Sequence, residues 1–245
     1  MNALQAELGR LYYAQGPDSQ NPEARASGLV AQDGRVRAMV LEMARPADWN
    51  ALSSVWRGVQ ADLELPAPAI AVSGVDAYQL WFSLVAPVAV VDAQAFLEFL
   101  RLRYLGTVTP ARIRMLPVAD PSSTGEIHHA SLVPALQQAT GRWSAFVAPD
   151  LAAIFCDEPW LDLPPSADAQ ASVLSRLECI KPAVFQTILD QTKAATTTAT
   201  SPKKVVADAA ALGKNLDPRQ FLQDVLNDEG IALHLRIEAA KALLR

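Results

Sequence analysis

The sequence predicts an α+β fold, in which helices pack against one antiparallel sheet. Two segments, 36–43 and 77–85, alternate apolar and other residues with the period-two spacing of half-buried strands. Segments with the three-to-four spacing of helices stand between and after them. Hydrophobic residues make up 51% of the 245 residues, which is enough for a sizeable core.

The first elements are a short helix and a hairpin. Residues 2–14 carry apolar side chains at the spacing of an amphipathic helix. Asp33-Gly34 lies between segments 29–31 and 36–43, and Asp-Gly in that setting is typical of a tight hairpin turn. The strand after the turn places Met39, Leu41 and Met43 on one face and Ala38, Val40 and Glu42 on the other.

The elements that follow complete a recognisable order. They are a helix over 46–63, a strand over 69–73, a strand over 77–85, a helix from Asp92, and a strand over 112–116. Together with strand 36–43 they give the order β-α-β-β-α-β, which is typical of ferredoxin-like folds. In that fold the helices cover one face of a four-stranded sheet, so we expect the other face to be open.

The rest of the chain predicts an extension and a small helical module. Residues 119–191 are less regular and contain two further helices, one capped by Ser166 and one beginning at Pro182. We therefore expect a domain over 1–191, with its core at about 28–118. A linker over 192–202 follows, and three short helices over 203–245 form a C-terminal module.

Composition narrows the class of protein. Two cysteines without CxxC spacing and three histidines make a structural zinc site unexpected, and we expect no cofactor. His128 and His129 are adjacent, so their rings would diverge on a strand instead of sharing a metal. The sequence carries no leader pattern and no run of 18 apolar residues, which predicts a cytoplasmic protein without a membrane partner.

The strand alternation predicts which side chains the open face carries. They are Glu42, Gln79, Trp81, Ser83, Arg112 and Arg114. Arginine pairs with phosphate and tryptophan offers a stacking plane, so this face suits single-stranded nucleic acid or a nucleotide. The alternative is that residues 119–191 fold over this face and enclose Trp81 in a second core. The rarity of exposed tryptophan favours that alternative.

Several short motifs resemble a known family. The motifs at 40–42, 68–74, 77–82 and 112–117 resemble, in the same order, the catalytic core of archaeo-eukaryotic primases and primase-polymerases. The resemblance covers about residues 28–118. Together with the strand alternation, it gives candidate binding residues at Glu42, Ser73, Gln79, Trp81, Arg112 and Arg114.

The departures from the family pattern indicate a non-catalytic relative. Family members hold two metals through an Asp-x-Asp pair, where this chain has Glu42-Met43-Ala44. A histidine that contacts the nucleotide follows the Ser-Gly turn in the family. Here Gln79 takes that place if one residue is inserted, or Tyr78 if none is. We therefore expect no catalytic residue and no metal site.

Three functions follow as hypotheses. The first is a non-catalytic primase-like protein of a replication locus or mobile element, with nucleic-acid contact through Trp81, Arg112 and Arg114. The second is a protein-interaction or scaffold module that recruits a protein partner through residues 203–245. The third is a divergent nucleotidyl transferase whose second metal ligand is another carboxylate, such as Asp76 or Asp120.

Overall fold

The computed structural model describes residues 2–14, 28–31, 33–119 and 127–200. The chain divides into two units, Met1–Ala195 and Thr196–Arg245. The described residues belong to the first unit, except for 196–200 at the end of the helix that leaves it. The predicted C-terminal module over 203–245 lies outside the described residues, so it stays a prediction.

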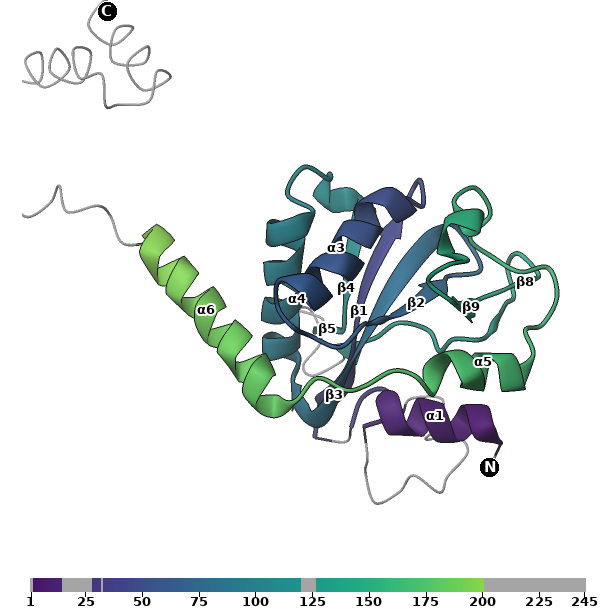
Figure 1. Ribbon diagram of the computed structural model, residues 1–245, viewed down its shortest axis with the longest axis horizontal. Coiled ribbons are helices and arrows are strands. Elements are labelled where there is room, and N and C mark those ends of the chain that lie inside the picture. Colours follow the sequence, from purple (N-terminus) through teal and green to yellow (C-terminus); the bar gives the residue numbers. More distant parts are fainter. Residues whose placement is uncertain (1, 15–27, 32, 120–126, 201–245) are drawn as a thin grey trace, which may run out of the picture. The chain divides into compact units, whose positions relative to one another are not determined.

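The centre of the first unit is a five-stranded antiparallel sheet with the order β4-β1-β3-β2-β9 (Figure 1). Its strands are β1 (Arg35–Ala44), β2 (Ala69–Val72), β3 (Ala77–Ala89), β4 (Ile113–Leu116) and β9 (Ala145–Val147). The short strands β5 (Val118–Ala119) and β6 (Ile127–His128) pair with each other, as do β7 (Leu136–Gln137) and β8 (Arg142–Trp143). The predicted α+β class with an antiparallel sheet is confirmed.

Helices accompany the sheet on both sides. They are α1 (Ala3–Leu11), α3 (Trp49–Ala61), α4 (Val90–Tyr104), α5 (Ala167–Leu174) and α6 (Pro182–Thr200), with 3-10 turns η1 (Pro110–Arg112) and η2 (Ala152–Phe155). From β1 to β4 the order is strand, helix, strand, strand, helix, strand. The predicted Asp33-Gly34 turn is present, with Gly34 at φ +74° and the Ala31 N–H donating to the Arg35 carbonyl at 2.8 Å.

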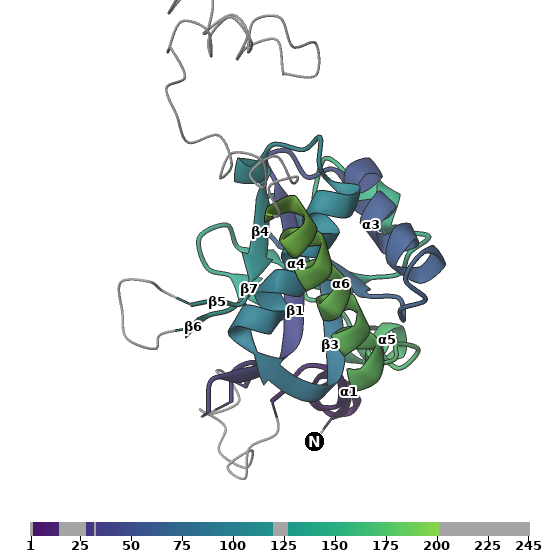
Figure 2. The ribbon, with the colours of Figure 1, turned by 90° about the vertical axis from the view of Figure 1, so that its left-hand side faces the viewer.

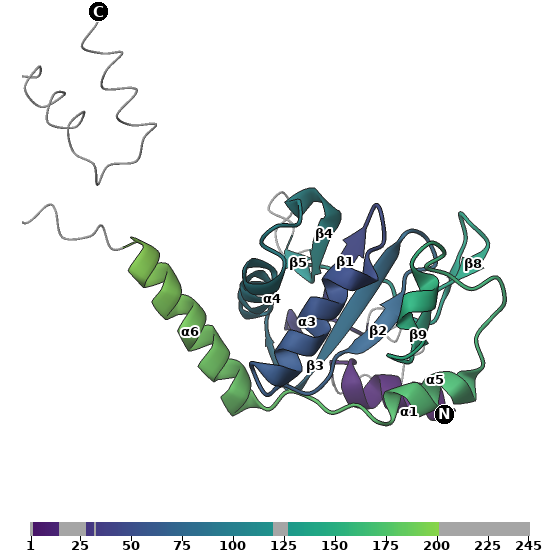
Figure 3. The ribbon, with the colours of Figure 1, turned by 45° about the horizontal axis from the view of Figure 1, so that its top comes forward.

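One face of the sheet packs on α3 and α4 (Figure 3). The apolar series of β1 and β3 point there together, as the alternation predicts, and they are fully buried: Met39, Leu41, Met43, Tyr78, Leu80 and Phe82. The first half of α6 joins this core beside α4, where the rings of Phe96 and Phe185 lie 5.3 Å apart (Figure 2).

The second face of the sheet is also covered, so the expectation of helices on one face and an open opposite face is wrong. A second core includes α1, α5 and residues from the segment 130–146. Trp81 lies in it and is 1% exposed. The reason is visible on the strands, because Ala38, Val40, Ala69, Ala71 and Trp81 form an apolar surface that water would otherwise contact. The alternative reading, a second core around Trp81, is confirmed.

Two arginines tie α1 into this second layer. The Arg10 guanidinium donates to the carbonyls of Leu177 (2.9 Å) and Leu174 (3.0 Å), where α5 ends. The buried Arg37 guanidinium reaches from β1 to the end of α1. It donates to the carbonyls of Arg10 (2.8 Å) and Tyr13 (3.1 Å), and also to Leu84 of β3 (3.0 Å). The Arg10 and Leu174 carbonyls lie in the last turns of α1 and α5, where a helix leaves carbonyls in need of donors, so the two guanidiniums bind there.

The edge strand β9 is closed by a side chain of α5. The Gln170 amide accepts from the Phe146 N–H at 2.7 Å and donates to the Phe146 carbonyl at 2.9 Å. Gln170 is buried. Its side chain thus takes the place that a neighbouring strand would have.

Several element ends differ from the sequence prediction. The fourth helix begins at Val90 and not at Asp92, which lies in its first turn. The less regular segment after residue 119 also contains the strands β8 and β9, which belong to different sheets. The predicted linker 192–202 is helical through Thr200, because α6 continues that far. Its alanines and threonines permit helix although they supply little apolar surface.

Glu64 occupies a backbone conformation that favours glycine, at φ +52° just after α3. The Leu65 N–H donates to the Val59 carbonyl at 3.0 Å, so the residue after Glu64 is tied back to the last turns of α3. We expect Glu64→Gly to stabilise the protein by about 0.5 to 1 kcal/mol, because a side chain at this φ is strained. Chemical denaturation would measure it. Glu64→Ala is the matched control, since it keeps the Cβ atom and should give no such gain.

Candidate binding site

The six predicted site residues fall into three separate places in the structure. Glu42, Gln79, Trp81 and Arg114 form one connected group, called here the polar chain. Ser73 lies in the turn between β2 and β3, and Arg112 lies in η1. The structure therefore brings four of the six together, and the other two form contacts elsewhere.

The polar chain runs across β3, β1 and β4. The Trp81 indole N–H donates to Gln79 Oε1 at 2.9 Å, and Gln79 Nε2 donates to Glu42 Oε2 at 2.7 Å. Arg114 Nη1 donates to the other carboxylate oxygen, Glu42 Oε1, at 3.0 Å. Neighbouring register positions explain this order, because Glu42 pairs with Gln79 on one side and with Arg114 on the other. The buried carboxylate thus has a hydrogen-bond donor on each oxygen.

Trp81 lies deep in the second core and has no surface for stacking on a base. Its ring meets Tyr12 edge-on at 5.2 Å and Phe146 edge-on at 5.9 Å, while His129 lies 6.5 Å away. Together with its burial, these contacts make Trp81 a core residue. Its predicted direction, away from α3 and α4, is correct.

The Ser73-Gly74 turn is closed by its own contacts. Ser73 Oγ accepts from the N–H groups of Val75, Asp76 and Ala77 at 3.0–3.2 Å. The Gly74 N–H donates to the Pro159 carbonyl at 3.0 Å. Gly74 has φ +79°, and a Cβ atom there would lie 2.8 Å from the Ser144 nitrogen, so the segment after β8 packs directly on this turn.

Arg112 does not share a face with Arg114, contrary to the alternation. Residue 112 belongs to η1, so the period-two pattern begins only at Ile113. Its guanidinium donates to the Pro46 carbonyl at 2.8 Å and lies 3.8 Å from the Asp48 carboxylate. Asp48 is the N-cap of α3, and so Arg112 secures the segment that leads into that helix.

Of the other carboxylates proposed for metal binding, the described one, Asp76, is paired elsewhere. Asp76 forms an ion pair with Arg45 at 3.4 Å, and Asp120 lies outside the described residues. Within the described ranges, no three histidine, cysteine, aspartate or glutamate side chains are grouped closely enough to hold a metal.

Sequence reasoning missed the role of His129. Its Nδ1 accepts from the Ala130 N–H at 2.7 Å, and its Nε2 lies 3.1 Å from the Ala38 carbonyl of β1. Burial lowers the pKa of His129 to about 4, against an ordinary value of 6.5. The adjacent pair His128-His129 is visible in the sequence, but nothing in it indicates that one ring enters the core.

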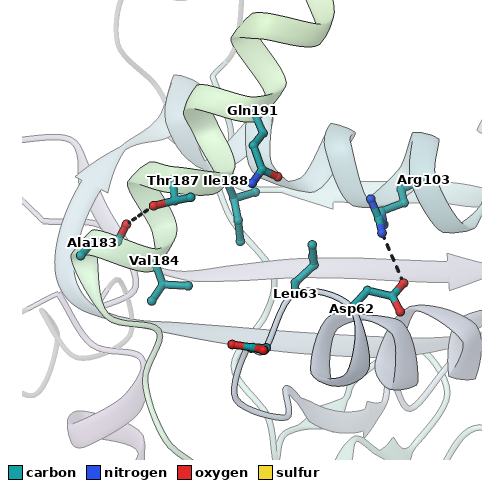
Figure 4. Close-up of a pocket in the computed structure, with 9 residues that line it drawn as sticks. Asp62, Leu63, Arg103, Ala183, Val184, Thr187, Ile188 and Gln191 are labelled. Carbon is teal, nitrogen blue, oxygen red and sulfur yellow. Dashed lines mark hydrogen bonds and ion pairs between the residues drawn. The ribbon is translucent and has the colours of Figure 1, made fainter.

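A separate cavity of about 440 Å³ lies between the end of α3, the end of α4 and α6 (Figure 4). Its lining includes Leu63, Val184 and Ile188, with an ion pair between Arg103 and Asp62 at 3.5 Å. It contains none of the predicted site residues.

No protein-family model matches the sequence, and no curated protein matches it either. In the part of the chain that the structure describes, no helix has both the length and the apolar content needed to cross a membrane.

Proposed function

We propose that the chain is a non-catalytic protein built on a ferredoxin-like, primase-like core. The observation that carries this is the state of Glu42, the carboxylate at the position where the resembled family holds its metals. Gln79 and Arg114 each donate to one of its oxygens, so the residue acts as an internal partner in the sheet. A role in replication or on a mobile element rests on the same motif resemblance.

Two further contacts support a structural use of the resembled positions. In the Ser73-Gly74 turn, backbone N–H groups donate to Ser73 Oγ and to the Pro159 carbonyl, in place of a phosphate. Trp81 is enclosed by aromatic rings on the second face. Positions that would contact a nucleotide in the family thus contribute to the stability of this fold.

A primer-extension assay with Mg²⁺ and with Mn²⁺ tests the absence of catalysis. We expect wild type and Glu42→Ala to give the same background signal, because the carboxylate already has a donor on each oxygen. Glu42→Gln is the control for folding, since an amide keeps the size and one acceptor of the side chain. Extension by the wild type that disappears in Glu42→Ala would instead support the nucleotidyl transferase.

Single-stranded DNA binding across the second face is not expected. Of the proposed contacts, Trp81 is buried and Arg112 is turned toward α3, while the Arg114 side chain is 62% exposed. Fluorescence anisotropy at low salt should show no binding that depends on Arg114. Arg176→Ala, at another exposed arginine, is the matched control. Binding that Arg114→Ala abolishes and Arg176→Ala preserves would restore the nucleic-acid hypothesis.

A second candidate is a protein-interaction module that uses the C-terminal unit. The observation in its favour is the division of the chain after Ala195. Among the described residues, the last one that belongs to either core is Leu189. Deleting residues 203–245 should leave the thermal unfolding of the first unit unchanged. Partner recovery should be lost in the same variant, and equal recovery would exclude this function.

A further inference from the structure

His129 connects the layer that covers the second face to the sheet itself. Its ring lies beside Trp81, and the next residues, Ala130 and Val133, belong to the second core. Its Nε2 atom meets the Ala38 carbonyl of the central strand β1 at 3.1 Å. The covering segment, defined here as residues 129–133, is thus held to β1 by an imidazole.

The two ring contacts fix one form of the imidazole. Nδ1 accepts a hydrogen bond from the Ala130 N–H at 2.7 Å, so it carries no proton. The neutral ring then has its proton on Nε2, which donates to the Ala38 carbonyl. Protonation would place a second N–H on Nδ1, directly facing the Ala130 N–H. The cation therefore cannot keep both contacts.

Among the residues that the structure describes, no charged side chain offsets this conflict. Burial is the dominant influence and lowers the pKa of His129, while the hydrogen bond to the Ala38 carbonyl acts in the opposite direction. Arg37 is committed to backbone carbonyls, and Glu42 and Arg114 are bonded to each other. Burial raises the pKa of Tyr12, so this phenol stays neutral. Among the described residues, the titratable or charged groups on the elements around the ring are Arg35, Arg37 and Glu42 on β1, Tyr78 on β3, Arg114 on β4, Glu7, Arg10 and Tyr12 on or just after α1, and the neighbouring His128.

We propose that His129 is an acid-sensitive latch, whose neutral ring holds the covering segment on β1 and whose protonation releases that segment while the sheet stays folded. Release would uncover Trp81, since the segment forms one side of its surroundings. The sheet remains because its first core, with α3 and α4, contains no part of the segment.

The sign follows from the two pKa values. The pKa is about 4 when the segment is closed and 6.5 is the ordinary value for an exposed ring, so the open form binds the proton more tightly. The closed form therefore has its full stability above pH 6.5, and its stability relative to the open form decreases as the pH falls from 6.5 toward 4. Between pH 7 and pH 5 the opening equilibrium should rise roughly twentyfold.

Hydrogen exchange of the full chain tests the latch. After correction for intrinsic exchange, the amides of residues 129–133 should lose protection roughly twentyfold from pH 7 to pH 5, while those of β1 and β3 should not. His129→Gln should remove the pH dependence because an amide does not titrate. His128→Gln is the matched control and should retain it. Equal protection of residues 129–133 at both pH values would overturn the proposal.

A measurement on the wild type keeps the test independent of any variant. NMR of the imidazole nitrogens should show the Nε2–H form of His129 at pH 7, with no titration near pH 6.5. A protonated Nδ1 at pH 7, or an ordinary pKa in the folded protein, would equally contradict the latch.

Discussion

Replacing Arg37 by methionine should cost the folded protein about 3 kcal/mol, because several backbone carbonyls would lose their donor at once. The guanidinium joins β1 to the end of α1 and to Leu84 of β3, and its buried position excludes water as an easy substitute. For a unit of this size we expect the melting temperature to fall by roughly 6–12 °C. Thermal unfolding followed by circular dichroism would measure the shift.

Two variants separate the hydrogen bonds of Arg37 from its charge. Arg37→Lys keeps the charge but lacks the planar fork, so it should recover only part of the lost stability. Arg35→Met changes an exposed arginine on the same strand and should have little effect. A melting temperature for Arg37→Met within 2 °C of the wild type would show that these contacts contribute little.

Trp81→Ala should destabilise the protein by about 3 to 5 kcal/mol, as expected for removing a buried aromatic side chain from a core. The vacated space would lie between Tyr12, Phe146 and His129, which hold their own positions through other contacts. Denaturant unfolding monitored by the remaining tryptophans would measure the loss. A stable Trp81→Ala protein would mean that this ring is a surface residue after all.

Trp81→Phe and Trp160→Ala refine that experiment. Phenylalanine keeps an aromatic ring but leaves Gln79 Oε1 without its donor, so a loss of about 1 to 2 kcal/mol is expected. Trp160 is only partly buried and lies 3.6 Å from the Arg142 guanidinium carbon. Its replacement by alanine should cost about 1 kcal/mol, the scale of an exposed cation–π contact.

The sheet and its first core could be predicted because strand alternation and helix spacing are local signals. Met39, Leu41 and Met43 face α3 and α4 as expected, and the turn at Asp33-Gly34 is where the pattern indicates. The direction of Trp81 was equally predictable from the alternation of β3. What the alternation could not reveal is which distant segment meets that face.

The second core depends on contacts between residues far apart in the chain. Tyr12 and Phe146 both reach Trp81, yet neither position carries a local signal for this meeting. Arg112 illustrates a different limit, since one 3-10 turn at the start of a strand rotates a side chain to another face. Its contact with Asp48 could not be predicted either, because it joins two elements that lie far apart in the sequence.

The amide of Gln170 sets the width of the sheet at one end. Backbone groups of an uncovered edge strand recruit further strands, from the same protein or from another copy. At β9 an added strand would first have to break both hydrogen bonds between Gln170 and Phe146. Growth by strand addition is therefore opposed there by a single side chain, carried by a helix that packs against α1 in the second core.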